Sequence, residues 1–177
     1  FKPTSLLCRI NAEAGRSGVE VSKTDEEILK LCEHTFQISK GLNDPTSLPL
    51  TNLWDQAGRE NRIPSSREIE EAKNLISWPT VEWGNGRVFL PEKGMALEIG
   101  GFGKEYAVDH LIGFAKRLGI VDCLVDLGRD VAALGQPPNG PVWVVGIEDA
   151  KEEEVVAFRL AVSGKGLATS GNGRRYR

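Results

Sequence analysis

Apolar positions first recur at helical spacing between residues 24 and 40. The stripe repeats every three or four residues, which is typical of an amphipathic helix. Ser22 with Asp25, or Thr24 alone, can cap its start, and Gly41 can end it. This first helix is expected to bury Ile28, Leu31, Cys32, Thr35 and Ile38.

Two further helices follow from the same spacing. Ser65 and Glu68 form the Ser-x-x-Glu pattern of a capping box, which predicts a helix start at that point. The other helix begins after a glycine-rich turn at residues 100–103 and ends at Gly119. Their expected buried residues are Ile69, Ala72, Leu75 and Ile76 in the former, and Ala107, Leu111, Phe114, Ala115 and Leu118 in the latter.

Residues 41–64 carry no such stripe and contain four residues that favour turns, which predicts a long loop: Pro45, Pro49, Gly58 and Pro64. Gly84-Asn85-Gly86 separates two short apolar runs and is typical of a β-hairpin. Strands are expected at residues 81–83, 87–90, 95–99, 121–127, 131–134, 142–147 and 155–162. Helices interspersed with hairpins predict a mixed α/β (α+β) sandwich rather than a parallel sheet.

The turn at residues 100–103 is the strongest candidate for chemistry. Glycines there can supply positive φ angles and close approach, and N–H groups at a helix N-terminus suit a phosphate. Lys104, Asp109 and His110 follow within the next seven residues. An ordinary strand-to-helix turn is the alternative, since a glycine-rich turn alone is a weak signal.

Two standard phosphate motifs do not match this turn. A P-loop has Ser or Thr after its Gly-Lys pair, whereas Glu105 follows Lys104 here. The Rossmann fingerprint has a third glycine where this chain has Tyr106. A phosphate bound at this turn would therefore be held in another way.

Composition narrows the class of protein. The 177 residues carry a net charge of −3, with 40% apolar and 27% charged residues, as expected for a globular domain with a sizeable core. Weak acidity argues against nucleic acid as a partner, and no apolar run approaches the ~20 residues of a transmembrane helix. Cys8, Cys32 and Cys123 are odd in number and widely spaced, which favours small core residues over disulfides or zinc ligands.

Five segments, in matching order, resemble motifs of one family. They are Phe1-Lys2-Pro3-Thr4-Ser5 with Asn11, Asp44-Pro45-Thr46 with Leu53-Trp54, Glu98 to Asp109 around the glycine turn, Leu127-Gly128-Arg129-Asp130-Val131, and Ala168-Thr169-Ser170-Gly171 with Arg175-Tyr176. Together they are similar to the ApbE family of FAD:protein FMN transferases. The resemblance implies an ApbE-like, T-fold-like sandwich of mixed sheets packed with helices.

The resemblance also implies a reaction. Such enzymes bind FAD and Mg²⁺, and a Ser or Thr hydroxyl of a target protein attacks the FMN-side phosphorus. FMN then becomes attached to the target protein and AMP leaves. Catalysis of this kind depends on positioning and on neutralising charge at phosphorus.

Transferred position by position, the resemblance implies catalytic roles for Lys104, Asp109 and Asp130, and a metal-ligating backbone carbonyl at Ala107. It implies FAD contacts at Phe1, Asn43, Asp44, Thr46, Lys104, His110, Thr169 and Ser170. Each position also has a structural interpretation. Phe1 can be a core aromatic, the Asp44 region a turn before a proline, and the remaining polar residues surface or turn residues.

Two departures from the family pattern concern charge. Glu105 stands where the motif has Gly, beside the expected phosphate site, and Arg129 replaces the second Gly of a Gly-Gly-Asp motif. Arginine there could hold a phosphate. The alternative functions are therefore a non-catalytic FAD-binding module and a degenerate ApbE-like scaffold protein.

Family members begin with a further strand and continue with a segment that supplies carboxylate and hydroxyl metal ligands. The resemblance thus implies that residues 1–177 form a single flavin transferase domain without these two segments. It also implies a periplasmic or membrane-anchored location. Free cysteines suit a cytoplasmic protein equally well.

Overall fold

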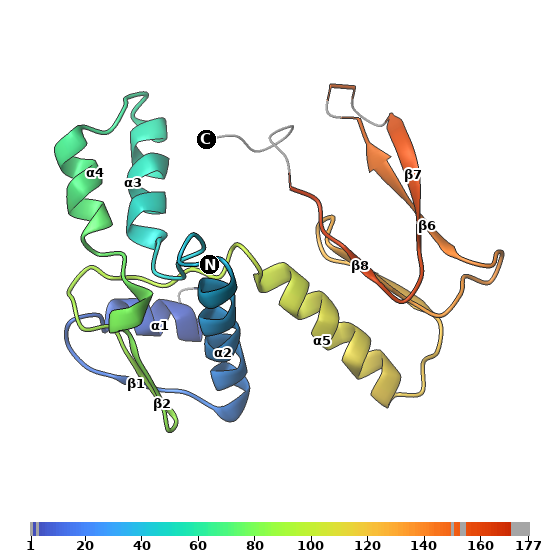
Figure 1. Cartoon of the computed structure of the whole chain (residues 1–177), viewed down its shortest axis with the longest axis horizontal. Coiled ribbons are helices and arrows are strands. Elements are labelled where there is room, and N and C mark those ends of the chain that lie inside the picture. Colours follow the sequence, from blue (N-terminus) through green and yellow to red (C-terminus); the bar gives the residue numbers. More distant parts are fainter. Residues whose placement is uncertain (1, 3, 150, 153–154, 171–177) are drawn as a thin grey trace. The chain divides into compact units, whose positions relative to one another are not determined.

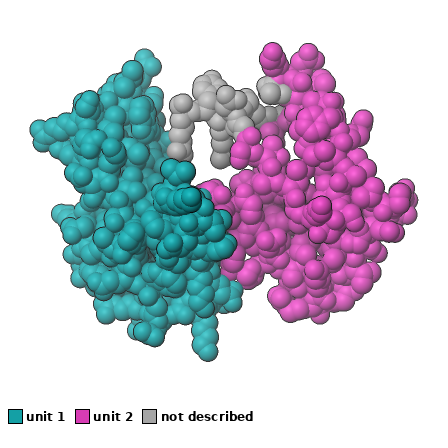
Figure 2. Space-filling view, viewed as in Figure 1, with its two compact units in different colours: residues 1–99, 177 teal, residues 100–176 magenta. Residues whose placement is uncertain are grey.

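A computed structural model of the chain describes residues 2, 4–149, 151–152 and 155–170. The chain divides into two compact units (Figures 1 and 2). Among the described residues, the first unit covers 2–99 and the second covers 100–170. The expectation of a single domain stays a prediction.

The first unit contains most of the helices. Its elements are α1 (Leu6–Ala12), β1 (Val19–Glu20), α2 (Lys23–Ile38), α3 (Leu48–Arg59), α4 (Ser66–Lys73), the 3₁₀ helix η1 (Trp78–Thr80), β2 (Glu82–Gly84) and β3 (Arg87–Phe89). The second unit contains α5 (Gly103–Arg117), β4 (Cys123–Asp126), β5 (Val131–Leu134), β6 (Trp143–Glu148), β7 (Val156–Val162) and β8 (Gly166–Leu167). All pairs between these strands are antiparallel, which confirms the mixed α/β prediction.

The capping predictions for α2 and α4 are confirmed. Ser22 accepts a hydrogen bond from the Asp25 N–H, and the Asp25 carboxylate accepts one from the Ser22 N–H. The Ser65–Glu68 pair closes the start of α4 in the same reciprocal way. Each box satisfies backbone donors that a helix start would otherwise leave unpaired.

The loop predicted over residues 41–64 is wrong, because α3 occupies its centre. Pro49 lies in the first turn of α3, where its missing N–H costs no helical hydrogen bond. Gly58 lies in the last turn, with open space where a side chain would stand. Both residues were interpreted as breakers, although their positions near the two helix ends are compatible with a helix.

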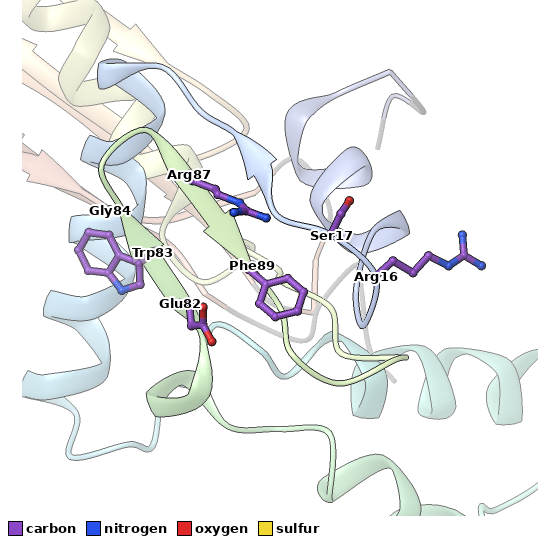
Figure 3. Close-up of a pocket in the computed structure, with 7 residues that line it drawn as sticks. All are labelled: Arg16, Ser17, Glu82, Trp83, Gly84, Arg87 and Phe89. Carbon is purple, nitrogen blue, oxygen red and sulfur yellow. The ribbon is translucent and has the colours of Figure 1, made fainter.

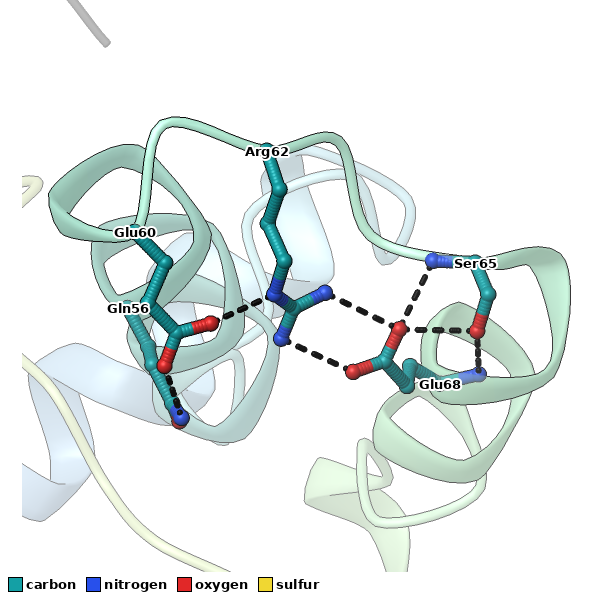
Figure 4. Close-up of polar contacts among 5 residues, drawn as sticks. All are labelled: Gln56, Glu60, Arg62, Ser65 and Glu68. Atoms are coloured by element: carbon teal, nitrogen blue, oxygen red, sulfur yellow. Dashed lines mark hydrogen bonds and ion pairs between the residues drawn. The ribbon is translucent and has the colours of Figure 1, made fainter.

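Arg62 joins the end of α3 to the start of α4. Its guanidinium pairs with Glu60 and, through two nitrogens, with Glu68 (Figure 4). Hydrogen bonds from Ser65 and Arg62 lower the pKa of Glu68 to about 2. One carboxylate therefore caps α4 and fixes the short connection before it.

The predicted hairpin is confirmed in the sheet β1-β3-β2. Asn85 and Gly86 have φ of 52° and 76°, the left-handed pair that a tight type I′ turn requires. Val88 in the central strand is fully buried. One face of this small sheet therefore belongs to the core of the first unit.

Residues 95–99 do not form the predicted strand. Their pairing groups are taken by other partners: the Asn11 side chain bonds both the N–H and the carbonyl of Leu97, at 2.8 and 3.0 Å. The Glu98 N–H donates to the Pro45 carbonyl, and a single parallel bridge joins Ala96 to Ser47. Leu97 is buried. The apolar pattern of this segment therefore reflects burial, although its backbone does not pair in a sheet.

In the second unit, α5 packs on β4 and β5. Strands β4, β5 and β8 form one sheet, and β6 and β7 form a separate hairpin (Figure 1). The predicted buried face of α5 is partly wrong. Ala115 is buried with Val108, whereas three predicted core residues are exposed: Leu111, Phe114 and Leu118.

Within the described residues, no helix is both long and apolar enough to cross a membrane.

Candidate functional site

The glycine-rich turn leads directly into α5, as predicted. Its N-cap residue is Phe102, whose side chain makes no capping hydrogen bond. The first N–H groups of the helix thus lack a side-chain cap, which suits an anion. Gly100, Gly101 and Gly103 do not adopt positive φ, so the expected conformational reason for these glycines is wrong.

In the second unit, some of the predicted site residues contact one another through Asp130. It lies just before β5 with only 2% of its surface exposed. Lys104, in the first turn of α5, forms an ion pair with its Oδ2 atom, and the Thr169 N–H donates to Oδ1 at 3.4 Å. Among the described contacts Oδ2 accepts no hydrogen bond besides this ion pair. The structure therefore brings together three predicted residues from three segments.

The turn before Asp130 holds its backbone in an uncommon conformation. Gly128 and Arg129 have φ of 63° and 78°, and a non-glycine residue there is strained. The Arg129 N–H donates to Asp126 Oδ1 at 2.8 Å. Such strain is often found at functional positions, where the surrounding structure holds it in place.

Arg129 also pairs with Glu148 of β6 across 2.7 Å. These two residues, with Asp126 and Thr169, line a cavity of about 170 Å³ beside the Asp130 cluster. Sequence reasoning missed Glu148, which lies 19 residues from Arg129 and in no motif. The one sequence signal for this contact is Arg129 itself, because an arginine in a position where the motif has glycine requires an acidic partner nearby.

The other predicted residues of α5 lie apart from this cluster in the described contacts. Asp109 and His110 are exposed, and the His110 ring stacks near Tyr106 with centroids 4.4 Å apart. Ala107 lies inside the helix, where carbonyls accept backbone hydrogen bonds. Ser170 is exposed next to Thr169. The roles assigned to these residues stay predictions.

In the first unit, Asp44 and Thr46 satisfy one another. Asp44 Oδ1 accepts hydrogen bonds from the N–H and hydroxyl of Thr46, at 2.8 and 2.6 Å. Asp44 Oδ2 accepts from the Trp78 N–H, and the Thr46 hydroxyl accepts from the Ser77 N–H. This agrees with the turn interpretation, while Asn43 is exposed. The predicted FAD contacts of all three stay predictions, and Phe1 lies outside the described residues.

The predicted Mg²⁺ site finds little support in the described residues. They contain no group of three or more His, Cys, Asp or Glu side chains placed to hold a metal. Mg²⁺ requires near-octahedral oxygen ligands, including at least one carboxylate or phosphate. The carbonyl of Ala107 alone does not supply that set.

The model of the ApbE family matches residues 1–177. FAD:protein FMN transferase from Escherichia coli K12 is 28% identical over 183 residues, covering 99% of this chain and 52% of its own length. This chain therefore spans about half the length of the curated relatives it matches.

Solved structures show the same fold. The ApbE protein of Thermotoga maritima superposes with a TM-score of 0.84 at 29% identity, covering 98% of this chain and 57% of its own. Flavinyl transferase ApbE of Pseudomonas stutzeri, in its apo form, gives 0.79 at 27% identity, covering 99% and 57%.

Proposed function

Because this chain belongs to the ApbE family, we propose that it acts in the transfer of FMN from FAD to a hydroxyl group of a protein. The observation that carries the proposal is the Lys104–Asp130–Thr169 cluster beside the uncapped start of α5. Its relatives in Escherichia coli and Pseudomonas stutzeri are named for this activity. A periplasmic or membrane-anchored location is also proposed, and rests on the resemblance alone.

Lys104 would bind the pyrophosphate of FAD. Its side chain is 51% exposed and the residue lies one position into α5, so its ammonium can reach a ligand at the helix start. A Lys ammonium and free backbone N–H groups together neutralise developing charge on phosphate oxygens. Thr169, whose N–H already bonds Asp130, would border the same anion.

Asp130 would accept the proton of the attacking hydroxyl. When Lys104 turns to a phosphate oxygen, the buried carboxylate loses its cation and is left free to accept a hydrogen bond from the attacking hydroxyl. The acceptor oxygen forms a bond to the FMN-side phosphorus, the phosphorus–oxygen bond to AMP breaks, and the proton moves to Asp130. Binding of the substrate and activation of the base are thereby coupled.

We also propose that the transfer of FMN depends on Mg²⁺. The described residues offer no group of three or more His, Cys, Asp or Glu side chains that could hold the ion. A bound metal would supply additional charge neutralisation at the pyrophosphate.

The test is FAD binding by the purified chain, followed by quenching of flavin fluorescence with and without Mg²⁺. Lys104→Met should weaken FAD binding about tenfold, as loss of one charge-assisted contact predicts. Lys116→Met, on the last turn of the same helix, is the matched control and should bind normally. Equal binding by the Lys104 variant and the unchanged chain would refute the role of the cluster.

A second function, an FAD-binding module without transfer, is favoured by one observation. Glu105 Oε2 is buried without a hydrogen-bond partner among the described residues, in the first turn of α5 where a phosphate would approach. A carboxylate there opposes the charge that the transition state develops. FAD binding that is indifferent to Mg²⁺, with no AMP released in the presence of a Ser- or Thr-bearing acceptor, would support this module.

A further inference from the structure

The first unit has a hollow on the outer side of its small sheet (Figure 3). Its volume is about 370 Å³, within the range of pockets that hold small ligands. The lining includes Arg16, Ser17, Glu82, Arg87 and Phe89. All belong to residues 1–99, so the hollow is built by one unit alone.

Strand register explains the floor of the hollow. Glu82 is paired with Phe89, and Gly84 with Arg87, so these residues share one face of the hairpin. Val88 has the opposite orientation and is fully buried. The hollow therefore lies on the face that the sheet does not use for the core.

The wall of the hollow is held by backbone contacts. The Gly15 N–H donates to the Leu90 carbonyl at 2.8 Å, which fastens the segment after α1 to the residue that follows β3. The Ser17 hydroxyl donates to Glu13 at 2.8 Å, and the Ser17 N–H also bonds the Glu13 carbonyl. These hydrogen bonds hold the segment of residues 15–17 against the end of β3, so the two sides of the hollow are in place before any ligand binds.

Arg87 crosses directly over Gly18. A Cβ atom at Gly18 would lie 1.9 Å from the Arg87 Nε, so only glycine leaves room for this path. The guanidinium extends toward Ser17, whereas Arg16 stands at the outer rim (Figure 3). The guanidinium group that closes the hollow is therefore placed by the backbone beneath it.

The charges of the hollow are not matched internally. Among the described contacts, neither Arg16 nor Arg87 forms an ion pair, although Glu20 stands opposite Arg87 in the strand register. Glu82 is the one acidic residue in the described lining. The lining itself therefore holds two cations and one anion, while Glu13, bonded to Ser17, and Glu20 lie beside it.

We propose that this hollow binds a small organic anion, a carboxylate or phosphate attached to a planar or aliphatic body. The guanidinium of Arg87 can donate two parallel hydrogen bonds to such an anion, and Arg16 adds charge at the rim. The Phe89 ring offers the apolar surface on which the body rests. The lining of the hollow shares no residue with the Lys104–Asp130 cluster, and the proposal does not rest on the flavin chemistry.

Titration with phenyl phosphate, followed by amide and indole resonances in a ¹⁵N-labelled sample of the 177-residue chain, tests the proposal. Saturable shifts are expected at the amides of residues 15–18 and 82–89, while the Trp83 indole, on the opposite face with Val88, should shift less. Arg87→Gln should weaken binding about tenfold or more, as loss of a bidentate charged contact predicts. Arg59→Gln, an exposed arginine of α3 outside this lining, is the matched control and should bind as the unchanged chain does.

Benzoate and inorganic phosphate complete the experiment. Saturable binding of benzoate shows a carboxylate site, and binding of phenyl phosphate alone shows a phosphate site; either outcome supports the proposal. Phe89→Ala should weaken phenyl phosphate but leave the weaker binding of inorganic phosphate unchanged. The proposal is overturned if neither organic anion saturates, if inorganic phosphate binds as tightly as phenyl phosphate, or if Arg59→Gln matches Arg87→Gln.

Discussion

The two units bury different kinds of side chain. The largest fully buried residues all belong to the first unit: Trp78, Leu90, Met95, Leu97, Val88, Thr46, Pro45 and Cys32. The second unit buries mostly small aliphatic residues together with the charged Asp130. Along β7, Val156, Phe158 and Leu160 are exposed. The first unit therefore has a core of large apolar side chains. The second unit buries a charged residue and exposes apolar side chains along β7.

The two buried polar residues of this comparison, Thr46 and Asp130, also differ in how their polar groups are satisfied. Thr46, the buried polar residue of the first unit, is satisfied by close hydrogen bonds to its neighbours. Asp130 depends on Lys104, whose side chain is half exposed and able to leave. A buried charge with a movable partner lowers stability but suits binding and proton transfer.

Removing a buried aromatic side chain from the first unit and an exposed one from the second should give the largest contrast. Trp78→Ala should cost about 3–5 kcal/mol of unfolding free energy, because Trp78 is 2% exposed and leaves a large cavity. Phe158→Ala, at 55% exposure, should cost less than about 1 kcal/mol. Urea unfolding followed by far-ultraviolet circular dichroism measures both, and equal losses would contradict the contrast between the cores.

Thiol chemistry should separate the buried Cys32 of the first unit from the half-buried Cys123 of the second. Burial raises the pKa of Cys32 to about 12 from 9.0, which lowers its thiolate fraction about a thousandfold. Cys123, half-buried at the start of β4, is the comparison in the second unit. In the folded chain a disulfide reagent should modify Cys123 long before Cys32. Equally fast labelling would show that the core of the first unit opens readily.

Breaking a charge pair should matter more in the second unit than on the surface of the first. Lys104→Met should cost about 1–3 kcal/mol, because it leaves Asp130 buried without a cation, although exposure of Lys104 screens part of the effect. Lys73→Met removes the exposed i,i+3 pair with Glu70 and should change stability by less than about 0.5 kcal/mol. Thermal unfolding of the two variants compares them. Similar shifts would mean that Asp130 is solvated when unpaired.

The smallest effect concerns acid stability of the first unit. The folded pKa of Glu68 is lowered to about 2 from 4.5, so its ionised form stabilises the folded state above about pH 4.5. That contribution is lost as the pH falls through 2. Glu68→Gln should therefore reduce the pH dependence of stability between these values, while leaving Asp130 unaffected. An unchanged slope would mean that the Ser65 and Arg62 bonds do not persist in solution.

Local signals in the sequence predicted elements well where the deciding contacts are local. Both capping boxes and the Asn85-Gly86 hairpin rest on contacts within three or four residues. The loop assigned to residues 41–64 failed because Pro49 is permitted in a first helical turn, which a list of breakers ignores. The strand assigned to residues 95–99 failed because Asn11, 86 positions away, holds Leu97.

The candidate site was predicted only in part for the same reason. Lys104 and Asp130 were found from their motifs, and the structure pairs them. The pairing itself, the Arg129–Glu148 contact and the isolation of Asp109 on an exposed helix face depend on tertiary packing. Some apolar residues of α5 were predicted to be buried but are exposed. Helical periodicity identifies an apolar face, but it does not show whether another element packs against that face.

The bond between Asn11 and Leu97 has a consequence for how the chain is made. During synthesis, the Asn11 amide emerges long before its partner, and 86 further residues must follow. At ribosomal rates of about 5–20 residues per second, that interval is on the order of 10 s. Throughout it, the Asn11 side chain lacks the Leu97 backbone groups that it bonds in the folded chain.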